Sequence, residues 1–291
     1  MYLGIDIGGT NIKWGIFDLT FNLLEKHSKP TNSDYGPSHI IDSISEIINK
    51  NTNCRIGIGF PSVVSDIGYV HISPNMKDFE NINLKDELSK RTSKDVIIEN
   101  DANVAALAEL HFGNGIGLDN FIYVTLGTGI GGAIIINRKI FKGDNFGAGE
   151  IGYTTINFDD TRDNIKLNRK GILEDYTGLP RLTQKYQELG GDISMSMKEI
   201  SLNTKSDKIA IELFEYYGEM LGYGIASAMN LLDINNVIIG GGLSQVTDIM
   251  YNRLNEILKI RLLEHKQNNF VVQKAKYLSD AGIYGAASLY K

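Results

Sequence analysis

Three glycine-rich clusters in the sequence could hold phosphate groups. They are Gly8-Gly9-Thr10, the run Gly127–Gly132 with Thr128 inside it, and Gly240-Gly241-Gly242. Because glycine has no Cβ, the amide groups of such a turn can approach an anion closely and surround it. One glycine turn between strands is usually an ordinary hairpin, but three clusters and two threonine hydroxyls favour phosphate binding. The pattern predicts a nucleotide clamped between two domains, with its phosphates at the first two clusters and its base near the third.

Asp6 interrupts the apolar segment Tyr2–Ile7 shortly before the first cluster. A carboxylate without a partner would be costly to bury there. Two partners fit this position. The amides of the turn are one, and Mg²⁺ held through water is the other, because Mg²⁺ prefers few carboxylates and keeps much of its hydration shell. The adjoining turn Gly8–Thr10 favours Mg²⁺.

Asn100 and Asp101 stand where the apolar run Val96–Ile98 gives way to a helix-forming segment, Ala102–Phe112. A helix N-cap alone would explain Asp101. However, strand ends at this edge of an open α/β sheet face the ligand, and a carboxylate there can accept the proton of an alcohol that attacks a γ-phosphoryl group. The helix N-terminus favours the charged carboxylate and apolar burial opposes it, so the sequence leaves its charge state open.

Glu150 and Tyr153 lie in Gly147–Tyr153, a segment too rich in glycine to be the interior of a helix. An acidic residue in such a loop is usually solvated, but carboxylates together with Asn and Tyr also recognise neighbouring sugar hydroxyls. Glu174 falls near the start of an expected helix over Gly171–Lys185, where the helix dipole would also favour a carboxylate. The five histidines are scattered without metal-ligand spacing, and a single cysteine cannot form a multi-cysteine metal site.

The second cluster also fits the pattern G-x-G-x-x-G of nicotinamide dinucleotide proteins. That fingerprint must open a helix whose N-terminus faces the pyrophosphate. Here the β-type run Ala133–Ile136 follows, so we expect the turn to join two strands and not to bind a dinucleotide in that way.

The elements that must position these residues occur as two similar sets. A strand at Tyr2–Ile7, a glycine turn and a strand at Ile12–Phe17 correspond to Phe121–Leu126, the second cluster and Ala133–Ile136. Hydrophobic periodicity predicts further helices and strands, at residues 38–50, 55–60, 209–232, 237–239, 250–263 and 281–290. We therefore expect an α/β protein with two related domains around a central cleft, the first spanning residues 1–115 with the C-terminal helix 281–291, the second residues 116–280.

Composition limits the remaining classes of function. The chain has 291 residues, 42% of them hydrophobic, and a formal net charge of −6, which is typical of a folded protein without the basic surface of a nucleic-acid or anionic-membrane binder. No signal-peptide pattern is visible at the start, and no apolar run approaches the roughly 18 residues of a membrane span. We expect a cytoplasmic protein with no nucleic-acid or membrane partner.

Taken together, four motifs resemble the ROK family of sugar kinases: Asp6–Lys13, Glu99–Asn103, Leu126–Gly132 and Ile239–Gly242. The resemblance runs in the right order over essentially the whole chain, including Pro74-Asn75 and the segment Ala281–Ala287. It implies an actin-like, ribonuclease-H-like ATPase fold. It also implies phosphorylation of a hexose hydroxyl, usually O6, by ATP with Mg²⁺, and Asp101 as the catalytic general base.

The resemblance also implies a role for each motif residue. Residues that contact ATP phosphates or the nucleotide would be Asp6, Gly8, Gly9, Thr10, Asn11, Lys13, Gly127, Thr128, Gly129, Gly131, Gly240, Gly241 and Gly242. Asp6 would hold Mg²⁺ through water. Residues that contact the sugar substrate would be Asn75, Asn100, Asp101, Glu150, Tyr153 and Glu174.

The sequence departs from the family pattern at a zinc loop. The family commonly has His at position 153, followed by a loop with three cysteines. Here Tyr153 replaces the His, aliphatic residues Ile165, Leu167 and Ile172 stand at the cysteine positions, and Asn168 replaces a glycine. Without thiolates or the His, we expect no zinc. A tyrosine would suit a sugar with an aglycone or an altered substituent at C1–C2, so glucose, N-acetylmannosamine and β-glucosides stay open as substrates.

The family also contains sugar-sensing repressors, which add an N-terminal helix-turn-helix. The first phosphate turn begins here by residue 8, which leaves no room for that element and disfavours a regulator. Members often form homodimers, but this sequence by itself sets no oligomeric number.

Overall fold

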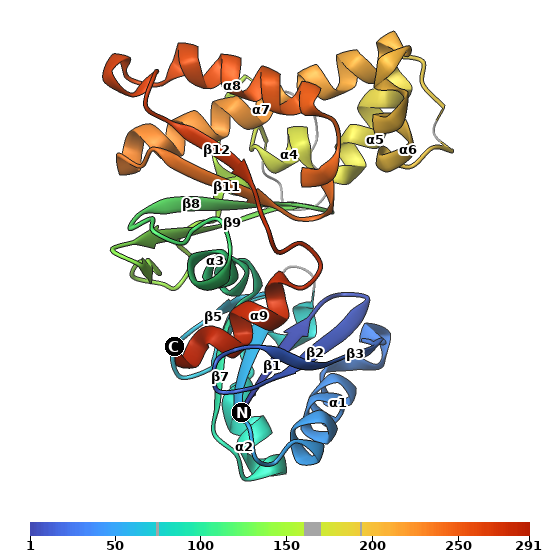
Figure 1. The fold of residues 1–291 in the computed structure, drawn as a ribbon. Helices are drawn as coiled ribbons and strands as arrows, with labels where there is room; N and C mark the ends of the chain where they lie inside the picture. The colour runs from blue at the N-terminus through green and yellow to red at the C-terminus, as the bar shows by residue number, and fades with distance from the viewer. Residues whose placement is uncertain (74–75, 160–169, 193) are drawn as a thin grey trace. The chain divides into compact units, whose positions relative to one another are not determined.

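The computed structural model describes residues 1–73, 76–159, 170–192 and 194–291. The chain divides into two compact units (Figure 1). Unit 1 comprises residues 1–118, 138–148 and 276–291, and unit 2 comprises residues 119–137 and 149–275. The segment 138–148, which the sequence analysis assigned to the second domain, belongs to unit 1 in this division.

Unit 1 is built on a five-stranded sheet in the order β3-β2-β1-β4-β7. Strands β1 (Tyr2–Ile7), β2 (Asn11–Phe17) and β3 (Leu23–Pro30) are antiparallel neighbours, whereas β4 (Arg55–Phe60) and β7 (Val96–Asn100) continue the sheet in parallel with β1. A hairpin of β5 (Val63–Val64) and β6 (Val70–Ile72) follows β4. The carboxyl ends of β1, β4 and β7 therefore meet at one edge of the sheet.

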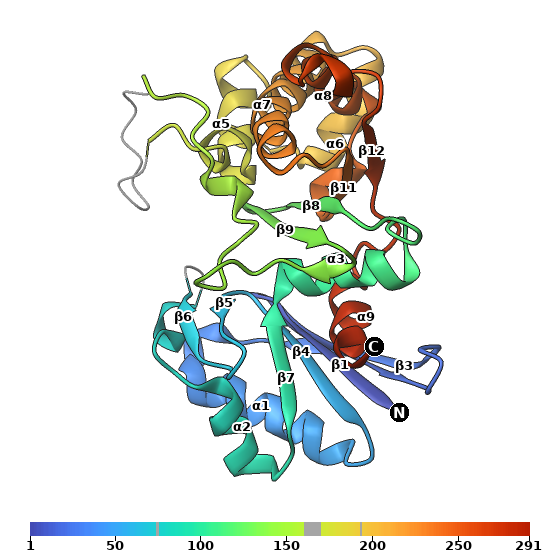
Figure 2. The same cartoon turned by 90° about the vertical axis from the view of Figure 1, so that its left-hand side faces the viewer.

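Helices cover both faces of this sheet (Figure 2). On one face, α1 (Gly36–Lys50) and α2 (Leu84–Thr92) pack against each other, and α1 buries a row of isoleucines in the core. On the other face lie α3 (Asp101–Phe112) and α9 (Ala281–Ala287). Helix α9 comes so close to the sheet that a Cβ at Gly4 or Gly57 would collide with the α9 backbone, so glycine is required at both strand positions.

A buried glutamate ties three segments of unit 1 together. Glu109 of α3 is 0% exposed. Its carboxylate accepts the Asn114 amide (2.8 Å) beyond the helix end and the Tyr277 amide (2.7 Å) before α9. These hydrogen bonds to main-chain donors satisfy a charge that would otherwise be costly to bury.

Unit 2 contains a second sheet in which β9, β8, β11 and β12 are neighbours in that order. Strands β8 (Phe121–Leu126) and β9 (Ile130–Ile136) form a hairpin, while β11 (Asn236–Gly240) and β12 (Val271–Lys274) run parallel to β8. A short strand, β10 (Lys139–Ile140), follows β9. The long helix α7 (Lys208–Leu232) packs along α8 (Asp248–Arg261), as Figure 1 shows.

The helix expected over Gly171–Lys185 is wrong. The structure has two helices there, α4 (Glu174–Thr177) and α5 (Leu179–Glu188), and α6 (Met197–Leu202) follows. The break is at Gly178, which has extended backbone angles, and Pro180 lies in the first turn of α5. Proline fits the first turn of a helix, where its missing N–H has no partner to lose. Within the described ranges, no helix combines the length and the apolar character that crossing a bilayer requires.

Candidate functional site

The first glycine cluster forms a pinned hairpin at the end of β1. Gly8 donates its amide to the Asn11 carbonyl oxygen (2.9 Å). The buried Thr31, just beyond β3, makes two hydrogen bonds to this turn. Its amide donates to the Thr10 carbonyl oxygen (2.9 Å), and its hydroxyl donates to the Gly8 carbonyl oxygen (2.6 Å). Gly9, Thr10 and Asn11 are exposed. The turn is therefore held firmly from one side while its tip faces solvent, which suits it to receive a ligand.

Asp6 and Lys13 form a cross-strand pair next to this turn. Burial raises the pKa of the Asp6 carboxyl to about 6, and the positive charge of Lys13 lowers it in part. The Lys13 ammonium donates to the Ser279 carbonyl oxygen (3.1 Å). The Asp6 carboxylate lies against Gly282 of α9, where a Cβ would collide with it. The Asp6 carboxylate is thus partly shielded from water, which disfavours its charged form, and a nearby cation would favour that form.

Asn100 and Asp101 begin α3. The cap is Asn100, whose side-chain oxygen accepts the amides of Ala102 (2.9 Å) and Asn103 (3.1 Å). Asp101 is the first helical residue, and one of its carboxylate oxygens also accepts the Ala102 amide (2.8 Å). Because Asn100 provides the cap, capping does not account for the carboxylate at position 101.

Glu99, which precedes Asn100 in β7, holds this junction in place through hydrogen bonds. One carboxylate oxygen of this buried residue accepts the Asn100 amide (2.9 Å) and the Asn103 side-chain amide (2.9 Å). Its other oxygen pairs with the Lys142 ammonium (2.7 Å). The backbone that carries Asn100 and Asp101 is therefore fixed by groups on both sides.

The strand register places Asp6 and the Asn100–Asp101 junction at the same sheet edge. Asp6 is opposite Gly59 of β4, and Gly59 is opposite Glu99 of β7. Neighbouring strands lie about 4.8 Å apart, so the β1 and β7 backbones are about 10 Å apart at this level. In parallel sheets this edge is where ligands bind. Unit 1 thus presents a phosphate-type turn, the half-buried Asp6 carboxylate and Asp101 along one edge.

The second glycine cluster forms a corresponding turn in unit 2. It joins β8 to β9, with the Gly127 amide donating to the Gly129 carbonyl oxygen (3.0 Å). The strand β9 begins at Ile130, so the cluster opens a strand and not a helix, as the sequence predicts. The Thr128 carbonyl oxygen accepts the Leu179 amide (3.1 Å) at the start of α5. This turn too is pinned from one side.

The third glycine cluster lies beside the second. Gly240 ends β11 and is opposite Thr125 of β8 in the parallel register. Gly241 has a φ of 83°, and a Cβ there would collide with the Leu126 backbone. Only glycine combines this backbone angle with so close an approach. The structure therefore brings Gly127–Gly129 and Gly240–Gly242 together at neighbouring strand ends of unit 2.

Three further predicted residues surround the start of β9. Glu174 of α4 accepts the Ile130 amide (2.9 Å) and its carboxylate lies against Gly129. Glu150 precedes, and Tyr153 ends, a short helical turn (Ile151–Tyr153) that packs on β9. A Cβ at Gly152 of this turn would collide with the Ile130 carbonyl oxygen. Glu150 is exposed and Tyr153 is 39% exposed. The segment that carries Glu150 and Tyr153 thus lies next to the second turn, and the Glu174 carboxylate holds the backbone at the start of β9.

Some predicted residues lie outside the described residues. Asn75 is among them, as are Ile165, Leu167 and Asn168 of the zinc-loop region. Ile172, the remaining aliphatic residue at a cysteine position, is 6% exposed and pairs with Thr155 in an isolated antiparallel bridge. A buried apolar side chain therefore occupies that position.

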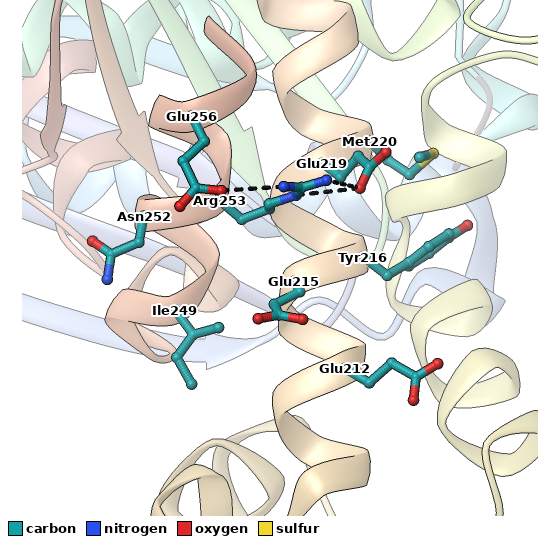
Figure 3. Close-up of a pocket in the computed structure, with 9 residues that line it drawn as sticks. All are labelled: Glu212, Glu215, Tyr216, Glu219, Met220, Ile249, Asn252, Arg253 and Glu256. Carbon is teal, nitrogen blue, oxygen red and sulfur yellow. Dashed lines mark hydrogen bonds and ion pairs between the residues drawn. The ribbon is translucent and has the colours of Figure 1, made fainter. Parts of the chain in front are cut away.

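A cavity of about 620 Å³ between α7 and α8 contains none of the predicted residues (Figure 3). Four glutamates line it, and Arg253 pairs with Glu219 (2.6 Å) and Glu256 (3.1 Å). The four glutamates outnumber the one arginine, so the net negative charge of the lining would repel a polyphosphate. This cavity is therefore unsuited to the nucleotide.

Among the described residues, no cluster of three His, Cys, Asp or Glu side chains could enclose a metal ion. Mg²⁺ does not need such a cluster, because it commonly binds one or two carboxylates together with waters and substrate phosphates. Asp6, a partly desolvated carboxylate beside a phosphate-type turn, fits this donor set.

Comparison with known proteins agrees with the resemblance seen in the sequence. The model of the ROK family matches residues 2–291. The chain belongs to the ROK family. Its two α/β units are those of the actin-like ATPase fold, as the sequence predicts.

Relatives within the ROK family cover nearly all of the chain. A glucokinase from Halalkalibacterium halodurans is 30% identical over 100% of this chain and 94% of its own. An N-acetyl-D-glucosamine kinase from Vibrio parahaemolyticus is 28% identical over 100% of this chain and 99% of its own. The crystal structure of a ROK glucokinase from Streptomyces griseus, in complex with glucose and AMPPNP, has a TM-score of 0.83 and 28% identity over 99% of this chain and 98% of that one.

Sequence reasoning missed three supporting residues of this ROK protein. Thr31 pins the first turn, and nothing in its sequence surroundings indicates this, because the contact spans 23 residues. Glu99 follows the apolar run Val96–Ile98, and an acidic residue at the end of such a strand is a signal in the sequence that could have identified it. The ion pair of Lys142 with Glu99 is likewise a product of tertiary structure.

Proposed function

We propose that this ROK protein is an ATP-dependent sugar kinase that transfers the γ-phosphoryl group of ATP to a hexose hydroxyl, O6 of glucose or of a related hexose. The observation that carries the proposal is the placement of Asp101. It begins α3 at the same sheet edge as the first phosphate turn and Asp6, and its position is not required for capping. Together with ROK family membership over residues 2–291, this supports a phosphoryl acceptor bound next to a general base.

The predicted residues perform three tasks in this reaction: proton transfer, orientation of the sugar and binding of phosphate. The Asp101 carboxylate accepts the proton of the sugar hydroxyl while the hydroxyl oxygen attacks the γ-phosphorus, and the bond to the β,γ-bridging oxygen breaks to release ADP. Asn100 contributes a side chain that orients the sugar. The exposed main chain and hydroxyl at Thr10, and those at Thr128, bind phosphate oxygens. Proton transfer by such a base contributes about 10²–10⁴-fold to the rate.

Mg²⁺ would be held by Asp6 through water and would neutralise phosphate charge when bound. The third glycine cluster, beside the second turn in unit 2, would provide main chain without side chains for the adenosine to approach. We also propose that the reaction takes place in the cytoplasm, where ATP is available. Zinc has no part in this scheme, since position 153 is a tyrosine and the chain has a single cysteine.

Glucose is the first substrate to test, and N-acetylated hexosamines and β-glucosides are the alternatives. The relatives named glucokinase and N-acetyl-D-glucosamine kinase support this range. Tyr153, which stands at the position of the family's His, offers a flat ring and one hydroxyl, and this favours a sugar with a substituent near C1–C2. Glu150 and Glu174 provide carboxylates that can accept hydroxyl hydrogen bonds.

A coupled ADP-release assay tests the proposal. Purified protein with MgATP is given glucose, mannose, fructose, N-acetylglucosamine, N-acetylmannosamine, N-acetylgalactosamine or a β-glucoside in turn. We expect ADP release above the sugar-free background with at least one of them, and its loss in Asp101→Asn. Background rates with every sugar would refute the proposed function.

A further inference from the structure

Lys142 occupies an unusual position in unit 1. Its ammonium lies 2.7 Å from a Glu99 carboxylate oxygen and 2.6 Å from one of Asp66. The Glu99 side chain is only 5% exposed, whereas that of Asp66 is 70% exposed. One lysine thus bridges a buried carboxylate and a surface carboxylate from two distant parts of the chain.

Both carboxylates belong to elements at the Asn100–Asp101 junction. Glu99 accepts the Asn100 amide, as described above. Asp66 lies in the turn of the β5–β6 hairpin, and the base of that hairpin also reaches the junction. There the Ser62 carbonyl oxygen accepts the Asn100 side-chain amide (3.3 Å), and the Ser62 and Ser73 hydroxyls are hydrogen-bonded (2.7 Å).

Lys142 itself begins the segment that leads to Glu150. The Ala148 amide donates to the Lys142 carbonyl oxygen (3.1 Å), which closes residues 142–148 into a loop. Within this loop, the Phe146 ring stacks on His71 of β6, with centroids 6.0 Å apart and planes 11° apart. The loop is therefore attached to the β5–β6 hairpin at two points, the ion pair of Lys142 and the ring of Phe146.

The charges of this cluster depend on one another. Burial lowers the pKa of the Lys142 ammonium, but hydrogen bonds and charges of Asp66 and Glu99 raise it by more, so that its pKa ends above the usual range. Lys142 therefore stays charged over the whole range in which a kinase works. Removing it would leave the buried Glu99 carboxylate without its cation, and an uncompensated buried charge is strongly destabilising to its surroundings.

We propose that Lys142 is a positioning residue for the sugar: by bridging Glu99 and Asp66, it fixes the Asn100–Asp101 junction, the β5–β6 hairpin and the loop leading to Glu150 in one arrangement. The inference rests on the proposed function. Lys142 acts through Glu99, whose carboxylate pairs with the Lys142 ammonium and accepts the Asn100 amide. Its effect should fall on sugar binding and orientation, because all three connected segments carry or precede predicted sugar contacts and none of them is a phosphate turn.

The test compares Lys142→Met with Lys142→Arg and with a matched control, Lys29→Met. Lys29 has an equally exposed side chain (27%), pairs with Glu46 (3.3 Å) and belongs to β3, at the opposite edge of the sheet from β7. We expect Lys142→Met to lose about 10²-fold in kcat/KM for the sugar, the scale of a small misplacement of reacting groups, with KM for MgATP changed less than about twofold. Lys142→Arg should restore most of the loss, and Lys29→Met should match the wild type. Wild-type sugar kinetics in Lys142→Met would overturn the inference.

Three further variants cover the case in which Lys142→Met folds poorly. Asp66→Asn removes only the exposed arm and should cause a smaller loss in the same direction. Glu99→Gln keeps the shape of the side chain but removes its charge, and the double variant Glu99→Gln/Lys142→Met should be no worse than the poorer single variant, because the two residues act as one unit. Losses that add in full would show that the pair does not act together and would contradict the proposal.

A structural readout separates this inference from the proposed function. If the wild type releases no ADP with any sugar, the proposed function fails, but hydrogen exchange still tests Lys142. Lys142→Met should then exchange faster than the wild type in residues 62–72 and 142–148, while α2 keeps its protection. Unchanged exchange in both segments would refute the positioning role even without an assay of activity.

Discussion

Asp6→Asn should stabilise the ligand-free protein while it destroys the activity. Burial raises the pKa of the Asp6 carboxyl from 3.8 to about 6, so the folded state binds this proton more tightly than the unfolded state. The stability gained from the proton is complete below about pH 4 and is lost as the pH rises through 6. A shift of about 2 units corresponds to about 3 kcal/mol, so at pH 7 the charged Asp6 costs up to that amount. Asparagine has the same shape and does not ionise.

Urea unfolding at a series of pH values measures this effect. At pH 7 we expect Asp6→Asn to raise the free energy of unfolding by up to about 3 kcal/mol, and the difference from the wild type should shrink toward zero as the pH falls to 4. Sugar-dependent ADP release should fall to background, because a neutral amide is a poor partner for Mg²⁺ and its waters. The variant would thus show that stability is given up at this position for function.

Asp18→Asn is the matched control, since Asp18 also lies in unit 1 but has the opposite pKa shift. Hydrogen bonds from Asn22 and Thr20 lower the pKa of the Asp18 carboxyl to about 2. Its contribution to stability is present above pH 4 and is lost as the pH falls through 2, so Asp18→Asn should destabilise at pH 7. The reasoning about Asp6 fails if Asp6→Asn is less stable than the wild type at pH 7, or if its effect is the same at pH 4 and pH 7.

Three other substitutions test separate parts of the structure. Asp101→Asn should lower kcat by about 10²–10⁴-fold with an unchanged urea midpoint; full activity would remove Asp101 from the role of base. Gly241→Ala should lower the free energy of unfolding by at least about 1 kcal/mol, because position 241 has a positive φ and a Cβ there collides with the Leu126 backbone; it should also raise KM for ATP. Gly242 has open space around it, so Gly242→Ala should leave the thermal midpoint unchanged. Equal thermal midpoints for the two variants would contradict the packing argument. Glu109→Gln should lower the free energy of unfolding by about 1–3 kcal/mol, because the glutamine amide cannot accept the hydrogen bonds of both the Asn114 and the Tyr277 main-chain amides. A thermal midpoint equal to that of the wild type would show that these two hydrogen bonds do not contribute to stability.

The sequence was sufficient to predict the strands that carry the first two glycine clusters. Apolar runs separated by glycine predict the β1–β2 and β8–β9 hairpins, and both are confirmed with their turns at Gly8–Thr10 and after Leu126. The fold class is confirmed as well. These features depend on local patterns, because each apolar run is long enough to indicate a strand whatever segments pack against it.

Other elements were hidden because their stability comes from tertiary contacts. The strand β3 reads Leu-Leu-Glu-Lys-His-Ser-Lys-Pro, a charged edge strand without an apolar pattern, and pairing with β2 alone defines it. The break between α4 and α5 had a visible signal in Pro180, which the helical periodicity of the region obscured.

The roles of the site residues stay predictions, although the structure brings several of them together. Glu174 illustrates what sequence reasoning cannot supply. Its place near the start of a helix was expected, but its hydrogen bond to the Ile130 amide joins residues 44 positions apart. Such contacts follow from the way strands and helices pack, and single-sequence patterns carry no record of them.

The docking of α9 on β1 and β4 has a consequence for how the protein is made. The strands of this sheet lie within residues 2–100, yet the helix that packs on β1 and β4, with Ile283 and Ala287 against Phe17, follows all of unit 2 in the chain. During synthesis the apolar face of β1 and β4 therefore lacks this helix until residues 276–291 emerge, whereas every residue of unit 2 is already available. A chain truncated before residue 276 would keep all of unit 2 but would expose this face of unit 1 to chaperones and proteases.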